Sequence, residues 1–248
     1  MPTDLVKLEL DNYDLQDFVA VAANFGQSSY DYVVTPNADH MIRYYDDPIF
    51  RDLYASAGYV LLDSRFLSYL LGGQPRMSVC AGSDLTAALF NQVIKADDEL
   101  VLIGATEDQA QRLRTMLGLK QLHHYNPPMG FIKNPEAVET CLQFIEQHSP
   151  FRFCFLAVGC PQQEILAQKL KQRGKAKGLA LCIGASINFL TGEERRAPRW
   201  MQRTGLEWLY RLLQDPKRLA HRYLVRGPRI FWLLRTMRVG PRAAARPA

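Results

Sequence analysis

The stretch from Phe153 to Leu170 restricts the fold of this chain more than any other part of the sequence. Its apolar run ends at Gly159, and a proline then precedes two glutamines, a glutamate and a segment whose apolar residues recur at helical spacing. This order predicts a buried strand, a tight turn and the N-terminus of a helix. Such a turn directs free backbone N–H groups and the positive end of a helix dipole toward whatever lies above the sheet. Gln163 and Glu164 therefore either bind a sugar or ribose, or belong to an ordinary polar corner.

The same pattern recurs along the chain. Apolar runs that end in Thr, Asp or Gly, namely YVVT, YVLLD, SVCAG, LVLIG and LCIG, alternate with amphipathic segments. This alternation predicts an α/β fold with a Rossmann-like, doubly wound and mostly parallel sheet. The strands are expected to include residues 76–80 and 178–190. The glycine turns match neither GxGxxG nor GxxxxGK[ST], which disfavours a dehydrogenase and a P-loop NTPase.

The composition predicts a folded protein without a membrane-spanning segment. At 248 residues and 48% hydrophobic content, the chain is long and apolar enough for one large α/β domain or two small ones. It contains no uncharged apolar run of about 18 residues, and its start lacks the basic-then-apolar pattern of a signal peptide. Five cysteines without CxxC spacing are typical of core thiols in a reducing cytosol rather than of a metal site. They are Cys80, Cys141, Cys154, Cys160 and Cys182.

Charge divides the chain into a slightly acidic body and a strongly basic end. Residues 195–248 contain 13 Arg and one Lys against two acids, a net charge of +12, so the other 194 residues together carry −7. Within this end, Trp, Leu and Phe mix with Arg at helical spacing, which predicts a basic amphipathic helical appendage over residues 195–238. It either lies on an anionic membrane surface, packs on the core or another subunit, or binds RNA. We expect an α/β domain over residues 1–194 and a disordered tail over residues 239–248.

Polar residues follow two of the predicted strands. Thr35, Asn37 and Asp39 come after YVV, and Asp63 comes after YVLL, immediately before Ser64. These residue types cap helices well. Each of them therefore either caps the helix that follows or belongs to a ligand site, because open α/β sheets bind ligands at the carboxyl ends of their strands.

Eight pieces of the sequence occur in an order that resembles one known family. They are TPNAD, LLDS, AGSDL, LIGAT, NPPMGF, AVGCPQQE, CIGASINFLTG and the segment from RRAPRW to AHRY, and they extend from about Tyr32 to about Tyr223. Together they resemble the WecG/TagA/CpsF family of bacterial glycosyltransferases, and the GxPxQE turn and the last segment are the most specific pieces. Two positions depart from the family's usual pattern. Ser64 stands where the family usually has Gly, and Asn188 stands where it tends to have an acid, which bears on sugar preference more than on the fold.

The resemblance implies an inverting hexosyltransferase that needs neither a metal ion nor another cofactor. Such an enzyme moves glucose, N-acetylmannosamine or its uronic acid from a UDP-sugar to an undecaprenyl-diphosphate-linked saccharide during cell-surface polysaccharide synthesis. It would be a peripheral protein on the cytoplasmic face of the cytoplasmic membrane, and no nucleic-acid partner is expected. A homo-oligomer would cover apolar surface that a single copy exposes. The alternatives are a non-catalytic scaffold that binds a nucleotide sugar at the membrane, and an RNA-binding protein.

The resemblance also implies roles for individual residues. Asp63 corresponds to the family's proposed base, which would deprotonate the acceptor hydroxyl. Thr35 and Asn37 correspond to the polar pair beside that base. Gln163 and Glu164 correspond to the pair that would contact the donor, and Asn188 is a further candidate for donor binding. Without a metal ion, the leaving diphosphate needs N–H or guanidinium groups to stabilise its charge. The candidates are Gly159, Gly184, Arg211, Arg218 and Arg222.

Overall fold

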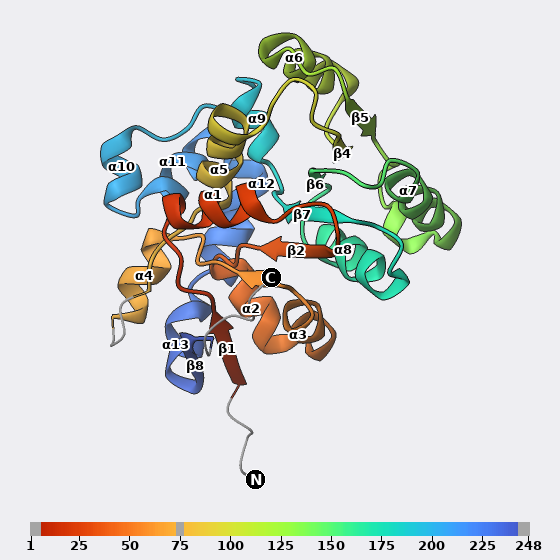
Figure 1. Ribbon diagram of the computed structural model, residues 1–248. Helices are drawn as coiled ribbons and strands as arrows, with labels where there is room; N and C mark the ends of the chain where they lie inside the picture. The colour runs from red at the N-terminus through yellow and green to blue at the C-terminus, as the bar shows by residue number, and fades with distance from the viewer. Residues whose placement is uncertain (1–5, 73–76, 243–248) are drawn as a thin grey trace.

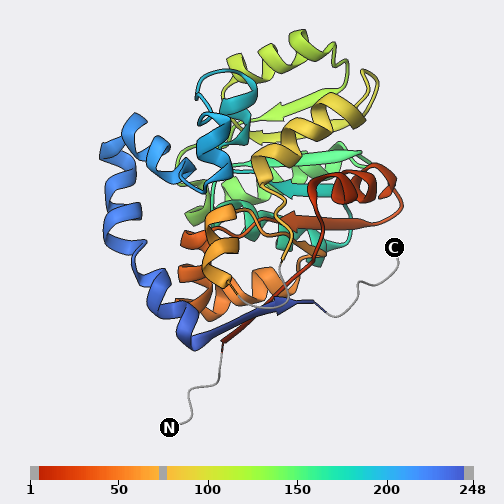
Figure 2. The ribbon, with the colours of Figure 1, turned by 90° about the vertical axis from the view of Figure 1, so that its left-hand side faces the viewer.

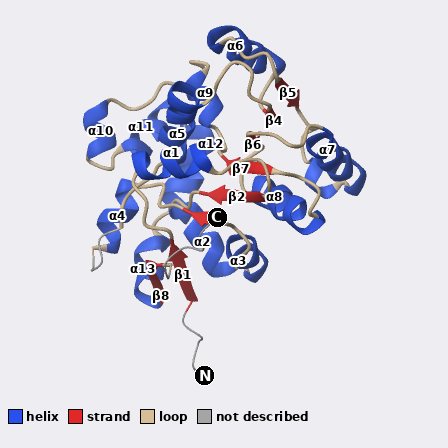
Figure 3. Cartoon of the chain, in the orientation of Figure 1, coloured by secondary structure: helices blue, strands red, loops and turns tan. Residues whose placement is uncertain are grey.

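The computed structural model describes residues 6–72 and 77–242, except for the side chain of Arg218. Six parallel strands form one sheet in the order β3-β2-β7-β6-β4-β5, and helices cover both of its faces (Figures 1 and 3). The predicted α/β fold with a parallel, doubly wound sheet is therefore confirmed. The strands are β2 (Tyr30–Val34), β3 (Tyr59–Val60), β4 (Leu100–Gly104), β5 (Leu122–Tyr125), β6 (Phe153–Ala157) and β7 (Gly178–Cys182).

Alternate residues of a strand point to opposite faces of the sheet, and each face has its own hydrophobic core. Phe153 and Phe155 of β6 lie in one core, whereas Cys154 and Leu156 lie in the other. A strand that is buried on both faces requires this pattern, because successive side chains alternate in direction. The first core is covered by α1 (Leu15–Asn24), α5 (Gly82–Ala88), α6 (Glu107–Leu117) and α9 (Ser186–Leu190). The second is covered by α2 (Ala38–Asp46), α3 (Pro48–Ala55), α7 (Pro135–Gln147) and α8 (Gln162–Arg173).

Two predicted strands differ from the structure. Residues 77–80, the described part of the strand expected over 76–80, follow an irregular path, although the N–H of Cys80 donates a hydrogen bond of 2.9 Å to the carbonyl of Leu62. The strand expected over 178–190 already ends at Cys182. Gly184 has a φ of 52°, a left-handed conformation that suits glycine, and it turns the chain into α9.

Residues 195–242, here called the C-terminal segment, run along one side of the α/β body (residues 6–194) as a series of short helices (Figure 2). The last of them, α13 (Arg229–Thr236), buries Ile230 and Leu233 in the core beneath it. Among the described residues, no helix is both long and apolar enough to cross a bilayer. The remaining elements of the segment are α10 (Arg199–Arg203), α11 (Glu207–Gln214), α12 (Pro216–Ala220) and the π-helix η3 (His221–Arg226).

The C-terminal segment ends in a strand, β8 (Met237–Pro241), that pairs in parallel with β1 (Val6–Leu10). The two strands form a separate small sheet at the foot of the molecule in Figure 2. The prediction of a disordered tail from residue 239 onward is therefore wrong for residues 239–241, and residues 243–248 lie outside the described part. The strand forms because β1 supplies a backbone partner and the side chain of Met237 is buried.

A polar contact follows directly after this strand. The Nη1 group of Arg242 donates hydrogen bonds to the carboxylate of Asp11 at 3.3 Å and to the carbonyls of Ala57 and Gly58 at 3.2 and 3.1 Å. Asp11 is buried, and its other contact is the backbone N–H of Val60 at 2.7 Å. Arg242 therefore ties the end of the C-terminal segment to two loops of the α/β body.

Candidate functional site

The carboxyl ends of β4, β6 and β7 surround a cavity of about 250 Å³. In an open parallel sheet this edge is where ligands bind, because the turns leave a crevice outside the strand ends. The structure brings Gly159 together with Gly184 and Asn188 in the cavity wall, although Gly159 lies 25 residues before Gly184 in the sequence. The complete lining consists of Ala105, Ala157, Val158, Gly159, Gly184, Ala185, Ile187 and Asn188.

Small residues at the end of β4 allow the turns to approach one another. Gly104 has a φ of 86°, and a Cβ atom there would lie 2.9 Å from the carbonyl carbon and oxygen of Ala157. Its neighbour Ala105 has a φ of 65°, the only positive value among the described residues other than glycine. A left-handed alanine is unusual and carries strain, which is found most often at functional sites. Gly104 and Ala105 thus allow the turn after β4 to lie close to the end of β6.

Gln163 connects the turn after β6 to the turn after β7. Its Oε1 atom accepts a hydrogen bond of 2.9 Å from the N–H of Gly184, and its Nε2 atom donates one of 2.9 Å to Oε1 of Glu164. Both side chains are buried, with exposed fractions of 3% and 1%. Through these hydrogen bonds they hold the turns in place, and they are not part of the cavity wall. The expectation that they contact the donor directly stays a prediction.

Asp63 and Thr35 both lie against Gly82. The N–H of Gly82 donates a hydrogen bond of 2.7 Å to Oδ1 of Asp63. A Cβ atom on Gly82 would lie 2.7 Å from Oγ1 of Thr35 and 3.5 Å from Oδ1 of Asp63, so only glycine leaves this space free. The helix after Asp63, α4 (Arg65–Leu71), is capped by Ser64, whose hydroxyl accepts from the N–H of Leu67. The carboxylate of Asp63 therefore does not cap α4, and it accepts a hydrogen bond from the first residue of α5 instead.

The environment of Asp63 makes its carboxyl a stronger base than usual. Burial raises the pKa of Asp63 to about 6, and the N–H of Gly82 and the positive charge of Arg211 only partly oppose this effect. A carboxyl group with this pKa is mostly ionised at neutral pH and still accepts a proton readily. These are the properties of a general base that works near neutral pH.

Two of the three predicted arginines reach this edge of the sheet from the C-terminal segment. Arg222 approaches Asn37, with Nη2 at 3.4 Å from its Oδ1 atom, and Asp39, with Nε at 3.5 Å from Oδ2. Arg211 stacks over the ring of Phe189 at 4.8 Å from its centroid. Arg218 lies in α12, and its side chain falls outside the described part of the chain. Asn37 also caps α2, because its Oδ1 accepts from the N–H groups that follow it.

Asn188 belongs to a polar network at the rim of the cavity. Its Oδ1 atom accepts a hydrogen bond of 2.9 Å from Gln109, and its Nδ2 atom donates one of 3.0 Å to Glu194. Gln109 also donates to Glu193 at 2.7 Å. Sequence reasoning missed the contribution of Gln109, since its position in an amphipathic helix gave no sign that its side chain points to the strand ends.

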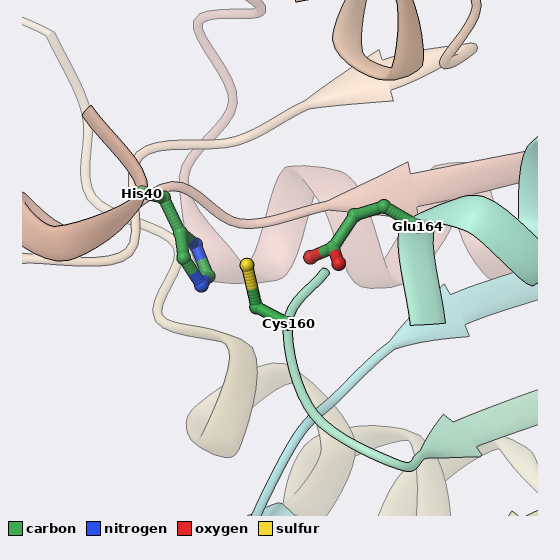
Figure 4. A group of neighbouring side chains, drawn as sticks. All are labelled: His40, Cys160 and Glu164. Carbon is green, nitrogen blue, oxygen red and sulfur yellow. The ribbon is translucent and has the colours of Figure 1, made fainter. Parts of the chain in front are cut away.

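Sequence reasoning also missed a cluster made by His40, Cys160 and Glu164. Figure 4 shows that these side chains point toward one another from α2, from the turn after β6 and from the first turn of α8. Burial lowers the pKa of His40 to about 4 and raises the pKa of Glu164, so burial favours the neutral form of both groups. The cluster was not visible in the sequence, because His40 lies far from the other two residues and no ligand spacing connects them.

The fold and its polar edge define an α/β protein with a ligand site at the carboxyl ends of parallel strands. A sequence profile of the glycosyl transferase WecG/TagA/CpsF family matches residues 3–244, which is nearly the whole chain. The chain therefore belongs to this family and is a glycosyltransferase. This finding confirms the family that the sequence motifs had indicated.

Proposed function

We propose that the protein transfers a sugar from a UDP-sugar to a saccharide carried on undecaprenyl diphosphate, with inversion at the anomeric carbon and without a catalytic metal ion. The observation that supports this proposal most is the carboxyl group of Asp63. It lies beside Gly82 and Thr35 at the edge where the strands end, and its pKa is raised to about 6. A single carboxylate of this kind suffices for a direct displacement, because such a reaction needs one base.

In the proposed step, the carboxylate of Asp63 accepts the proton of the acceptor hydroxyl. The acceptor oxygen forms a bond to the anomeric carbon as the bond between that carbon and the β-phosphate oxygen of UDP breaks. Because attack and departure occur on opposite sides of the anomeric carbon, its configuration is inverted. Thr35 lies against the same glycine as the base and would orient the acceptor hydroxyl.

The leaving diphosphate would be stabilised by the chain itself. The cavity between β4, β6 and β7 would receive part of the donor, with the turns at Gly159 and Gly184 in its wall. Arg211 and Arg222 would supply planar guanidinium groups, which bind pairs of phosphate oxygens. Charge that develops on a leaving group is stabilised best by groups that are already in place, and the stacking of Arg211 on Phe189 holds it in one orientation.

The C-terminal segment would hold the enzyme at the membrane that carries its acceptor. Large apolar side chains lie exposed along this segment between basic residues. Each basic residue near an anionic lipid surface contributes roughly 1 kcal/mol, and apolar side chains that enter the interface add to this attraction. We infer peripheral binding to the cytoplasmic membrane. The exposed residues are Trp200, Leu213, Leu224, Val225, Phe231 and Trp232.

A donor screen tests the proposed function directly. Purified protein is incubated in EDTA with single UDP-sugars and with membranes that contain lipid-linked acceptors, and UDP release is measured. Release from one sugar, dependent on the acceptor membranes, is the expected result and would also identify the donor. Absence of release from every sugar, with folded protein and an acceptor pool shown to be competent, would contradict the proposal and favour a scaffold that binds a nucleotide sugar. Competition of RNA with liposome binding would favour the RNA-binding alternative.

A further inference from the structure

The cluster of His40, Cys160 and Glu164 brings three different donor groups to one buried point. An imidazole nitrogen, the thiol sulfur and a carboxylate oxygen all lie within 4.8 Å of one another. His40 is 8% exposed and Glu164 is 1% exposed, whereas Cys160 is only partly buried. The proposed transfer reaction uses neither His40 nor Cys160, and the cluster therefore requires a separate explanation.

Two polar atoms in the cluster lack a hydrogen-bond partner within the described part of the chain. They are Nδ1 of His40 and Oε2 of Glu164. Buried polar atoms are nearly always paired, because burial without a partner removes their contacts with water and gives nothing in return. Figure 4 shows that both side chains face the thiol of Cys160, and both residues are buried. A further species bound between these two atoms and the thiol would satisfy both of them.

We propose that His40, Cys160 and Glu164 bind one Zn²⁺ ion. Imidazole, thiolate and carboxylate are the three ligand types of protein zinc sites, whereas Mg²⁺ and Ca²⁺ prefer oxygen ligands alone. Tetrahedral zinc places its ligand atoms about 3.3–3.8 Å apart, so small rotations of the side chains would bring these atoms into position. Binding replaces the S–H bond of Cys160 with a Zn–S bond and releases the proton to solvent.

The chain supplies three ligands, and the fourth coordination position is left for water. The charges of one thiolate and one carboxylate balance the charge of Zn²⁺, and no step of the proposed transfer reaction uses the ion. The ion would join α2, which begins after β2, to the turn between β6 and α8. These two regions carry Asn37 and Gln163, so the ion would stabilise two elements that hold predicted site residues. The inference concerns binding only, and it does not depend on the proposed transfer reaction.

Metal binding by the purified full-length chain tests this inference. Protein stripped with EDTA and then freed of chelator is titrated with Zn²⁺ in competition with a chromophoric chelator. A second sample is titrated with Co²⁺, which absorbs in the near ultraviolet when a thiolate binds it. We expect one ion per chain, a thiolate-to-cobalt absorption band, and a higher melting temperature with Zn²⁺ than without it.

Variants distinguish this site from adventitious binding. Loss of an outer-shell partner already costs about tenfold to a hundredfold in metal affinity, so Cys160→Ser should weaken Zn²⁺ binding at least this much and abolish the cobalt band. Glu164→Gln should weaken Zn²⁺ binding but retain the band. Cys141→Ser, which removes a buried thiol in α7, is the matched control and should bind like the unaltered protein.

Two outcomes would overturn the inference. One is an unaltered protein that binds no stoichiometric Zn²⁺ and shows no thiolate band with Co²⁺. The other is a folded Cys160→Ser protein that binds Zn²⁺ as tightly as the unaltered one. Either result would mean that a proton held between Glu164 and its neighbours satisfies the cluster without a metal ion.

Discussion

The α/β body and the C-terminal segment use the same kinds of side chain in opposite ways. In the body, Phe153 and Phe155 of the central strand β6 have no exposed surface. In α13 of the C-terminal segment, Phe231 and Trp232 are 55% and 56% exposed, although they are equally apolar. The body also exposes single apolar residues such as Ile49 and Met129, but in the C-terminal segment exposed apolar residues occur in adjacent pairs, at 224–225 and 231–232.

The exposed residues of α13 are not explained by loose attachment of the helix. Ile230 and Leu233 of the same helix are 1% and 0% exposed, so its inner face is fully packed. A helix that only had to cover the body would present polar residues on its outer side. Phe231 and Trp232 also pack edge-on against Phe66 and Tyr45 of the body, at 6.3 and 6.2 Å between ring centroids, so they help to dock α13. Their exposed remainder is the surface that we propose to contact the membrane.

The comparison leads to a proposed division of roles: the base lies in the body, whereas the C-terminal segment would attach the enzyme to the membrane and contribute Arg211 and Arg222 to the site. Asp63→Asn breaks the chemistry alone, and we expect the largest effect from it. Loss of a general base typically costs at least about a hundredfold in rate, and transfer should fall by this much while liposome binding stays unchanged. Donor-dependent UDP release and liposome sedimentation measure the two properties separately.

The same variant makes a prediction about stability. The pKa of Asp63 is raised to about 6, above the ordinary value near 4, so its charge opposes folding above pH 6 and this penalty disappears below about pH 4. Asp63→Asn should therefore melt at the same or a higher temperature than the unaltered protein at pH 8. Asp17→Asn, on an exposed position of α1, is the control. In the transfer assay described above, full activity of Asp63→Asn would exclude this residue from the mechanism.

The pH dependence of transfer tests whether Asp63 of the body is the base. The base must be ionised to accept a proton, so the transfer rate should fall about tenfold for each pH unit below the pKa of about 6. The rate at saturating donor is measured from pH 4.5 to pH 8 with detergent-solubilised acceptor, so that membrane attachment does not enter. A rate that stays constant down to pH 5 would exclude Asp63 as the group that is titrated.

Attachment is tested by changing exposed apolar residues in the two regions. The C-terminal variant carries Leu224→Ser and Val225→Ser, at positions that are 58% and 63% exposed. Burial of one such side chain is worth about 1.5–3 kcal/mol, so loss of two should weaken binding to anionic liposomes more than tenfold. The matched variant changes Ile49 and Met129, which are exposed on the body, and should bind liposomes normally. Equal binding by both variants would contradict the division between the regions.

The sequence predicted the body better than the segment, for physical reasons. Strands buried on both faces leave long apolar runs, such as the one that ends at Gly159, and these runs are visible without a structure. The polar residues after them, including Thr35 and Asp63, could be located because parallel strands end at one edge. The sequence did not decide whether Asp63 caps the helix that follows it. In the structure, Ser64 caps this helix, α4.

Other features depend on contacts between distant residues and left no local signal. Nothing near His40 indicates that Cys160 lies beside it, since only the order of the strands brings α2 and α8 together. The strand β8 was missed because its sequence, MRVGP, contains glycine and proline and has little apolar pattern of its own. It forms because β1 provides a partner from the other end of the chain.

The contact between Arg242 and Asp11 offers the finest test of how the two regions are joined. Arg242→Ala removes three hydrogen bonds and leaves a buried carboxyl group without its positive partner. Because this pair is partly exposed, its contribution to the free energy of unfolding is limited to about 1–2 kcal/mol. For a chain of this size, each kcal/mol shifts the melting temperature by roughly 2–4 °C. We therefore expect a decrease of a few degrees at pH 7, measured by differential scanning fluorimetry. Arg238→Ala, at an exposed arginine of β8, is the control.

The effect of Arg242→Ala on the melting temperature should diminish at low pH, because protonation of Asp11 removes the charge that Arg242 balances. A decrease equal to that of the control at every pH would mean that backbone pairing with β1 and the packing of α13 hold the segment in place, and that the ion pair contributes little.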